Sequence, residues 1–265
     1  YQLTFADLGA PGPLPHPFAL VGDPGQIAPV VTGATRRWDA STTGPQIPAP
    51  QALIAAHGND VARLRLPQTW RFGPDTASLL APLYPSLPFT SARPPRNLTI
   101  GSQPIPEYRA TPVPATGGTA DPRVILTATQ TVRDLIATAT VNTPEESRPL
   151  TPADVAVIAP HVEQAALAAA GLADLPDVFV GTINQAQGLQ REAVVAIHPL
   201  LGHHVDESFA LDLGRLCVAL SRHRAHVTVI IDERSGDLLS DAIREHPEAR
   251  TLNVHAQLLD RLTAA

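Results

Sequence analysis

The sequence predicts an α/β protein built on a parallel β-sheet with helices on both faces. The chain has 265 residues, of which 44% are hydrophobic, and this is enough for a sizeable core in one large or two modest domains. From about residue 123 onwards, short continuous apolar runs alternate with segments of helical periodicity. Strands that are apolar along their whole length are typical of parallel sheets buried on both faces.

The expected elements follow one another in a regular order. A first apolar run, over residues 18–21, predicts a buried strand that ends at Gly22. The later runs predict strands at 123–128, 154–160, 177–182, 193–200 and 227–232. Apolar residues at helical spacing predict helices at 49–58, 129–143, 161–173 and 212–226.

The first half of the chain differs from the second in composition. Most of the 28 prolines lie in residues 1–122, and the segment 91–122 lacks a core pattern, so we expect an extended excursion there. We predict two domains, one over residues 1–59 and one over residues 60–265. The chain contains no Met, and we expect it to be part of a longer protein.

Composition narrows the chemistry that the chain can perform. The formal net charge is -6, so overall electrostatics do not indicate nucleic-acid binding. All 19 basic residues are Arg, whose planar guanidinium suits phosphate, although codon bias is the simpler cause of this composition. A phosphate site that needs Lys is excluded.

Two further features concern the compartment and metals. The single cysteine, Cys217, excludes an intrachain disulfide and predicts a cytoplasmic protein. No apolar run approaches the length that crosses a bilayer. The polar residues of segment 203–207 do not have the spacing of a zinc site, so we expect a polar loop there and no metal site.

Polar residues follow three of the predicted strands. Parallel sheets bind ligands beyond the carboxyl ends of their strands, so these residues are candidates for a site. They are Asp23 and Gln26 in the first set, Pro160, His161 and Gln164 in the second, and Thr182, Gln185, Gln187, Gly188 and Gln190 in the third. Each residue alone also fits an ordinary turn or loop.

Three arginines complete the candidate set. Arg71 lies in the stretch LPQTWRFGP. Arg215 and Arg222 are seven residues apart in the predicted helix 212–226, so we expect them on one helix face, with Arg224 on the other. A solvated helix face is the alternative interpretation.

The order of these segments resembles the superfamily 1 helicases, in particular the 5′→3′ branch that contains the nonsense-mediated-decay helicase. Five segments are similar, in order, to family motifs. They are GDPGQIAPV (family GDxxQLxPv), LRLPQTWRFGPDTASLLAPLYPSLPF (LxxQYRxxPxIxxlxxxxfY), VAVIAPHVEQ (ITPYxxQ), VGTINQAQGLQREAVVAI (VxTvdxfQGxExdvVi) and FALDLGRLCVALSRHRAHVTVI (RlNVALTRAkxxlxii). The resemblance covers roughly residues 18–232 and implies a RecA-like domain preceded by a partial RecA-like domain.

The resemblance also implies ligands and a partner. The family binds ATP and Mg²⁺ between two RecA-like domains, and single-stranded DNA or RNA crosses both domains. The family's phosphate loop GxxxxGK[ST] and its acidic motif DEAxQ do not occur in this sequence. We therefore expect an N-terminal RecA-like half of the same protein upstream, and an ATP-dependent helicase activity that the isolated chain lacks.

Roles are carried over onto the positions that match the motifs. Asp23 and Gln26 match GDxxQ, with Gln26 facing the γ-phosphate and the attacking water. Arg71 and Arg222 match the arginines of QYR and ALTR and are expected as arginine fingers. Nucleotide contacts are expected at Trp70, Gln187, Gly188, Gln190 and Arg215, and contacts to a nucleic-acid backbone at Pro160, His161 and Thr182. Further phosphate contacts are conceivable at Arg93, Arg96 and Arg109.

Three departures from the family pattern leave other functions open. Gln190 replaces the Glu that holds the ribose hydroxyls, His161 replaces a Tyr, and Gly214 replaces a frequent Arg. One alternative is a degenerate helicase-like module that binds nucleic acid or a partner protein without ATP hydrolysis. Another is a nucleotide-driven switch that remodels proteins. Trp70 also fits a core aromatic residue.

Overall fold

The chain divides into two compact units, Tyr1–Arg65 and Leu66–Ala265. The computed structural model describes residues 4–9, 19–29, 31, 33–115, 118–202 and 209–264. The two units are described separately below.

The first unit contains two short α-helices. They are α1 (Phe5–Gly9) and α2 (Ala49–His57), and a β-bridge joins Thr4 to Pro48. Pro48 and Pro50 flank the start of α2, where the missing proline N–H groups cost nothing. The helix expected at 49–58 is thus confirmed.

The strand expected at residues 18–21 is wrong for the part that the structure describes. Residues 19–22 have no regular secondary structure, and Val21 is 90% exposed. A strand needs a neighbouring strand to pair its backbone groups. Among the described residues of this unit, the only β-pairing is the bridge between Thr4 and Pro48.

The second unit is built on a five-stranded parallel sheet, in the order β5-β11-β10-β8-β9. Every neighbouring pair is parallel. The strands are β5 (Tyr108–Val113), β8 (Val155–Ala159), β9 (Phe179–Thr182), β10 (Arg191–Ile197) and β11 (His223–Asp232). Strands β8 and β10 are buried almost completely, as their continuous apolar sequences predict.

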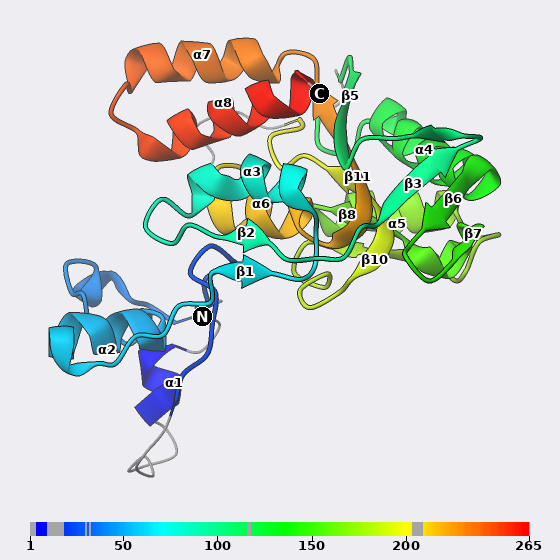
Figure 1. Ribbon diagram of the computed structural model, residues 1–265. Coiled ribbons are helices and arrows are strands. Elements are labelled where there is room, and N and C mark those ends of the chain that lie inside the picture. The colour runs from blue at the N-terminus through cyan, green and yellow to red at the C-terminus, as the bar shows by residue number, and fades with distance from the viewer. Residues whose placement is uncertain are drawn as a thin grey trace. The chain divides into compact units, whose positions relative to one another are not determined.

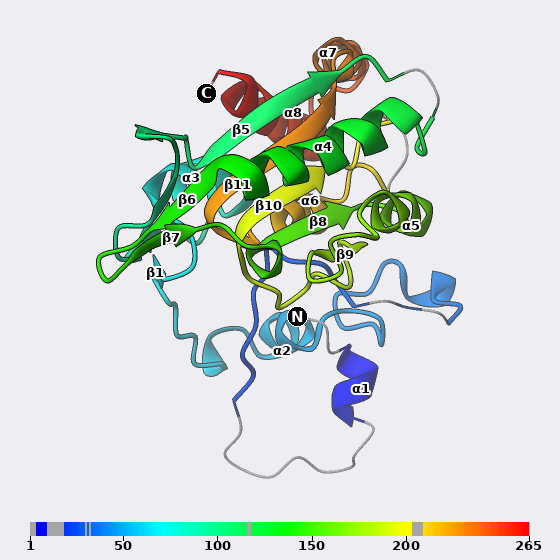
Figure 2. The same cartoon turned by 90° about the vertical axis from the view of Figure 1, so that its right-hand side faces the viewer.

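Helices cover both faces of this sheet (Figures 1 and 2). On one face lie α4 (Pro122–Thr138) and α5 (Val162–Gly171), which contact each other. On the other lie α6 (Leu213–Leu220) and α8 (Arg250–Thr263), with α7 (Ser235–Glu245) packed on α8 and α3 (Pro74–Leu80) beside α6 and α8. The predicted α/β class is therefore confirmed, and the arrangement fits a RecA-like fold.

One predicted strand is a helix. Residues 123–128 form the first turns of α4, whose start is fixed by Asp121, because its side chain accepts a hydrogen bond from the Arg123 N–H at 2.8 Å. Pro122 follows as the first helical residue. The buried side chains of Val124, Ala128, Val132 and Leu135 recur at helical spacing along one side of α4.

The proline-rich segment 91–122 contains strands that the sequence did not predict. Besides β5, it holds β3 (Asn97–Ile100) and β4 (Gln103–Pro104). With β6 (Ala139–Asn142) and β7 (Ser147–Pro149), these form an antiparallel sheet in the order β4-β3-β6-β7. Before them, β1 (Gln68–Thr69) pairs with β2 (Thr90–Ser91).

The helix expected at 212–226 is shorter than predicted. It begins after Asp212, whose side chain accepts hydrogen bonds from the Gly214 and Arg215 N–H groups, and it ends at Leu220. Strand β11 begins at His223. Arg222 therefore lies beyond the helix, and the expectation that it shares a helix face with Arg215 is wrong.

Candidate functional site

The candidate residues of the second unit divide between the two edges of the parallel sheet. We call the edge where the five strands begin the amino edge, and the edge where they end the carboxyl edge. Arg222 and Gln190 directly precede β11 and the β10 residue Arg191, at the amino edge. His161 and Thr182 lie at the ends of β8 and β9, at the carboxyl edge.

Arg71 and Arg222 meet at the amino edge. The Arg71 Nη1 group donates to the carbonyl oxygen of Ser221 at 3.2 Å, across 150 positions of sequence. The Arg222 Nη2 group donates to Ser221 Oγ at 2.8 Å. Arg71 is half-buried and Arg222 is only 1% exposed. Two guanidinium groups are thus hydrogen-bonded to one serine, and guanidinium is a group that binds phosphate well.

Trp70 precedes Arg71 and is 68% exposed. The alternative of a core aromatic residue is therefore wrong. The neighbouring Phe72 is buried and packs edge-on against Phe89. The exposure of the Trp70 ring leaves it available to stack on a ligand.

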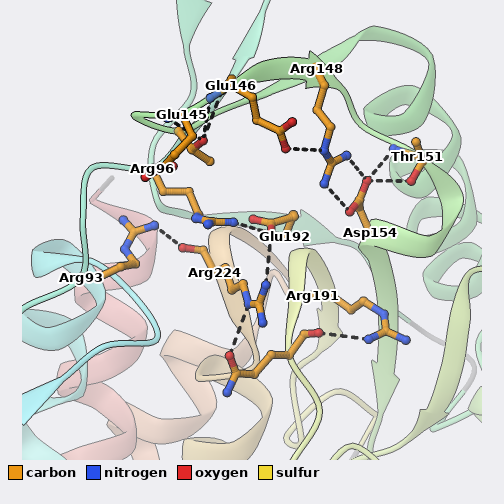
Figure 3. A network of polar contacts seen from close by, with 12 residues as sticks. Arg93, Arg96, Glu145, Glu146, Arg148, Thr151, Asp154, Arg191, Glu192 and Arg224 are labelled. Atoms are coloured by element: carbon orange, nitrogen blue, oxygen red, sulfur yellow. Dashed lines mark hydrogen bonds and ion pairs between the residues drawn. The ribbon is translucent and has the colours of Figure 1, made fainter.

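Figure 3 shows a network of arginine and glutamate side chains at the same edge, among them Arg191, Glu192 and Arg224. Gln190 is hydrogen-bonded to two of these arginines. Its Oε1 accepts a hydrogen bond from Arg224 Nε at 3.3 Å, and its backbone oxygen accepts one from Arg191 Nη1 at 3.0 Å. Arg224 also lies 3.5 Å from the buried carboxylate of Glu192, which binds Arg96 as well. The side-chain oxygen expected to hold a ribose is therefore engaged by Arg224.

Two of the arginines considered for extra phosphate contacts are bound to protein groups. Arg93 donates to the carbonyl oxygen of Arg224 and lies 4.0 Å from the carboxylate of Glu107. Arg96 donates to Glu192. The guanidinium groups of Arg93 and Arg96 thus bind carboxylate and carbonyl groups of the second unit.

The carboxyl edge carries a stack of three side chains. The His161 ring stacks on Phe209, with centroids 4.8 Å apart and 26° between the planes. The guanidinium of Arg215 lies 4.2 Å from the centroid of the same Phe209 ring, a cation–π contact. Arg215 also donates to Asn184 Oδ1 at 3.2 Å. Arg215, expected to contact nucleotide with Arg222, is thus placed with residues expected to contact nucleic acid.

The loop after β9 connects the two edges. Gln185 Oε1 accepts hydrogen bonds from Thr182 N at 2.8 Å and Thr182 Oγ1 at 3.2 Å. Gln187 is half-buried, with its N–H bonded to the Asn184 oxygen at 3.3 Å. Gly188 has φ 85°, a conformation that other residues rarely adopt, and is exposed.

The corner after β8 is fixed by Gln164. Its Oε1 accepts from the His161 N–H at 3.2 Å, and its Nε2 donates to the Thr119 oxygen. Gln164 is fully buried, which is typical of a structural role. Pro160 is also buried, whereas His161 and Thr182 are half-buried and keep part of their surface accessible at this corner.

In the first unit, Asp23 and Gln26 contact each other. Gln26 Nε2 donates to Asp23 Oδ2 at 2.7 Å, and the Gly25 N–H donates to Asp23 Oδ1 at 2.9 Å. This is an Asx-type turn, the ordinary interpretation of Gly-Asp in this place. The same turn holds the Gln26 amide next to a carboxylate.

The described ranges lack two further kinds of feature, a metal-binding cluster and a membrane-spanning helix. These contain no group of three or more His, Cys, Asp or Glu residues arranged to hold a metal ion. They likewise contain no helix whose length and hydropathy would let it span a bilayer. The polar segment 203–207 lies entirely outside the described residues.

Sequence reasoning missed Ser221, Phe209 and Glu107. Ser221 lies between two motif residues, and this position in the sequence could have identified it. Phe209 opens the fifth similar segment but has no periodic signal. Glu107 is a lone carboxylate among proline-rich sequence, and only the fold reveals its partners.

The fold and site define a class of protein: an α/β unit with a RecA-like parallel sheet and two arginines paired at its amino edge. No protein-family model matches the chain. A segment of 105 residues is 32% identical to the DNA-binding protein SMUBP-2 of Mesocricetus auratus, covering 37% of this chain and 11% of that protein. This match supports a helicase relationship for the chain, and the 5′→3′ branch stays a prediction.

Among solved structures, the arterivirus nonstructural protein 10, a helicase, aligns with a TM-score of 0.37 and 16% identity. The alignment covers 82% of this chain and 34% of that one. The chain therefore spans only a minor part of each of these two proteins.

Proposed function

We propose that this chain supplies the second RecA-like domain of an ATP-dependent helicase or translocase that moves on single-stranded nucleic acid. Arg71 and Arg222 act as arginine fingers on the γ-phosphate, and Trp70 stacks on the base. Gln26 senses the phosphate and the attacking water from the preceding partial domain. An upstream RecA-like half of the same protein provides the rest of the nucleotide site.

The observation that carries this proposal is the meeting of Arg71 and Arg222 at Ser221. The two arginines come from segments 150 positions apart, and the fold brings both guanidinium groups into hydrogen bonds with Ser221. Guanidinium groups bind phosphate oxygens through charge-assisted hydrogen bonds. In phosphoryl transfer, such charges stabilise the transition state and raise the rate about 10³–10⁵-fold.

The donor groups present fit the phosphates of ATP better than they fit its metal. Mg²⁺ prefers oxygen ligands, mainly carboxylates and waters. Asp23 is already bonded to Gly25 and Gln26, and the described residues hold no acidic cluster. We therefore assign Mg²⁺ to carboxylates outside this chain.

The carboxyl edge is the proposed path of the nucleic acid. Thr182 and His161 supply polar and aromatic surface there, and Phe209 and Arg215 extend it. Bases stack on such rings without regard to sequence. Since SMUBP-2 is named as a DNA-binding protein, single-stranded DNA is the first strand to test, followed by RNA.

The experiment compares ATP hydrolysis by the parent protein with and without single-stranded DNA or RNA. Turnover that nucleic acid stimulates supports the proposal. The isolated 265-residue chain is expected to hydrolyse no ATP, and measurable turnover that Gln26→Ala abolishes would contradict the assignment of the missing groups to an upstream half.

A second candidate is a helicase-like module that binds nucleic acid without hydrolysing ATP. Two observations favour it: Gln190 is engaged by Arg224, and Arg222 is almost completely buried. Nucleic-acid binding by the parent protein without hydrolysis would select this candidate. Hydrolysis that nucleic acid does not affect would instead select a nucleotide-driven protein switch.

A further inference from the structure

A buried polar cluster contacts the two segments that carry Arg71 and Arg222. Its members are Glu107, His223, Thr76 and Arg93, and their exposed fractions are 7%, 0%, 0% and, for the Arg93 side chain, 8%. Of these residues, the sequence suggested a role only for Arg93, as a candidate for phosphate contacts. A buried carboxylate is costly unless protein groups replace its water, so its partners indicate what it holds.

The Glu107 carboxylate binds the segment that follows Arg71. It accepts hydrogen bonds from the backbone N–H groups of Gly73, of Asp75 at 3.1 Å and of Thr76 at 3.3 Å. Bonds to a charged acceptor are stronger than neutral ones. A Cβ atom on Gly73 would lie 2.7 Å and 2.9 Å from the two carboxylate oxygens, so the backbone can approach this closely only with glycine there.

The same carboxylate reaches the segment that carries Arg222. His223 follows Arg222, and its Nε2 atom lies 3.7 Å from Glu107 Oε1 and 2.9 Å from Thr76 Oγ1. The backbone oxygen of Glu107 accepts a hydrogen bond from the Val227 N–H at 2.9 Å. Glu107 thus contacts both arginine-bearing segments although it belongs to neither.

The electrostatics of the cluster indicate an ionised Glu107 carboxylate and a neutral His223 ring. Burial by itself raises the pKa of Glu107, but the neighbouring His223 and the N–H groups of Gly73 and Thr76 outweigh it, so the pKa is below its usual value. Burial lowers the pKa of His223, and the charges of Arg93 and Arg71 act in the same direction, against that of Glu107.

The cluster is not a proton relay. In a Thr–His–Glu relay the hydroxyl and the carboxylate contact opposite ring nitrogens. Here Thr76 and Glu107 both face Nε2 of His223. The ring is also 0% exposed, so no substrate reaches it. The contacts fit a role in positioning.

We infer that Glu107 is a positioning residue that fixes Arg71 and Arg222 relative to each other at the amino edge. This inference rests on the proposed function only in that the two arginines act on a phosphate; the geometric part holds without any ligand. Displacements of about 1 Å cost about 10²-fold in rate in comparable sites. Loosening either segment should therefore lower turnover more than it weakens binding.

The geometric part is tested on the 265-residue chain with Glu107→Gln. Glutamine keeps the size of the side chain but lacks the charge and brings an N–H₂ group among N–H donors. Amide hydrogen exchange should become about tenfold faster at residues 73–76 and at 221–226, the factor expected for losing about one charge-assisted hydrogen bond. Unchanged exchange in both segments would overturn the inference.

Asp232→Asn provides the matched control. Asp232 is a buried carboxylate at the opposite end of β11, where it accepts the Arg234 N–H at 3.0 Å. This variant should leave exchange at 73–76 and 221–226 unchanged. If it accelerates both segments as much as Glu107→Gln does, the effect is general destabilisation and the inference is wrong.

A milder variant covers the case in which Glu107→Gln fails to fold. Thr76→Val keeps the shape of the side chain and removes only the hydroxyl bonded to His223. Exchange at 221–226 should rise about threefold, as expected for one neutral hydrogen bond. No rise in a folded Thr76→Val protein would contradict the link between the two segments.

The kinetic part uses the parent protein. Glu107→Gln should lower kcat for ATP about 10²-fold with KM nearly unchanged. If the wild-type parent hydrolyses ATP and the variant keeps its kcat, the inference fails and the proposed function stands. If exchange changes as expected but the wild-type parent does not hydrolyse ATP, the proposed function fails, whereas the geometric role of Glu107 is supported.

Discussion

The two edges of the parallel sheet use arginine in different ways. At the amino edge, Arg71 and Arg222 are held by hydrogen bonds to Ser221, and a buried carboxylate contacts the segments that carry them. At the carboxyl edge, Arg215 lies on the ring of Phe209, which also stacks on His161. The amino edge holds positive charge in a fixed position, whereas the carboxyl edge presents the flat faces of side-chain rings.

Helix α6 explains how two arginines seven residues apart reach such different places. It has eight residues, about 12 Å at 1.5 Å per residue, and it connects the two edges. Arg215 lies in its first turn and Arg222 beyond its end. Spacing along the sequence therefore predicted a shared face, whereas the end of the helix separates the two side chains.

The largest expected effect comes from removing the charge at the amino edge. In the parent protein, Arg222→Ala should lower ATP turnover about 10³-fold, because a finger's charge is missing from the transition state. Binding of ATP should change little, since the finger acts mainly on the developing charge. Steady-state hydrolysis and a nucleotide-binding titration measure the two quantities.

Arg215→Ala tests whether the arginines of the two edges have different tasks. Its guanidinium lies over Phe209, so its loss should weaken nucleic-acid binding and lower ATP turnover less than tenfold at saturating nucleic acid. Equal losses of turnover in Arg215→Ala and Arg222→Ala would show that the edges do not divide these tasks.

The next largest effects concern aromatic rings at each edge. Trp70→Ala should weaken ATP and GTP binding alike by about tenfold, because stacking does not distinguish bases. Phe209→Ala should weaken binding of single-stranded nucleic acid by a similar factor and leave nucleotide affinity unchanged. Unchanged nucleotide affinity in Trp70→Ala would show that this exposed ring has another role.

Acid should destabilise the fold through histidines near both edges. His226 donates from Nδ1 to the Pro106 oxygen at 2.6 Å, and its Nε2 lies 2.8 Å from Thr228 Oγ1, so the neutral ring is satisfied. Burial lowers the pKa of His226 to about 4. At the end of β10, burial and His255 lower the pKa of His198 to about 3.

These lowered pKa values set the direction of the pH dependence. The unfolded chain takes up these protons near pH 6.5, before the folded chain does, so the stabilisation is complete above pH 6.5. It is lost as the pH falls from 6.5 towards 4, at up to about 1.4 kcal/mol per pH unit for each histidine. Urea unfolding at pH 7, 6 and 5 measures this slope.

His226→Gln should make this slope shallower, whereas the exposed His246 provides a control. His246→Gln should retain the wild-type dependence. A wild-type slope in His226→Gln would show that this ring does not contribute to acid unfolding.

The sequence predicted the central sheet well because its strands are apolar throughout. Strands β8, β9 and β10 lie where continuous apolar runs predicted them. A strand that is apolar along its whole length is buried on both sides when it pairs within a parallel sheet covered by helices on both faces. Strand β5 was missed because it lies among prolines, and its pairing partner β11 begins more than a hundred residues later. Residues 123–128 were assigned to a strand although Asp121 and Pro122 carried a readable helix-start signal.

The site was less predictable than the fold. Motif positions identified Arg71 and Arg222, and the structure does bring them together. The proposed positioning by Glu107 depends on tertiary contacts. On the Arg71 side, its carboxylate bonds to backbone N–H groups 31 to 34 positions away in the sequence, and no local pattern encodes such contacts. Phe209 was missed for the same reason, since only the fold places it against His161.

The smallest expected effect concerns Gln190, where the helicase family has Glu. At present its Oε1 accepts a neutral-acceptor hydrogen bond from Arg224 at 3.3 Å. Gln190→Glu adds a charged acceptor, which binds ribose hydroxyls more strongly but also binds Arg224 more strongly. We expect ATP affinity of the parent protein to rise by only about threefold, the surplus of a charged over a neutral hydrogen bond after this competition.

A double-variant cycle measures the competition directly. In Gln190→Glu combined with Arg224→Ala, the carboxylate has lost the competing guanidinium, so the gain in ATP affinity over Arg224→Ala alone should reach about tenfold. Comparing ATP with its 2′-deoxy form shows whether the gain involves the ribose hydroxyl. If neither background gains affinity, Gln190 is a neighbour of Arg224 and not a nucleotide ligand, and nucleotide recognition at the amino edge depends on Trp70 and the two paired arginines.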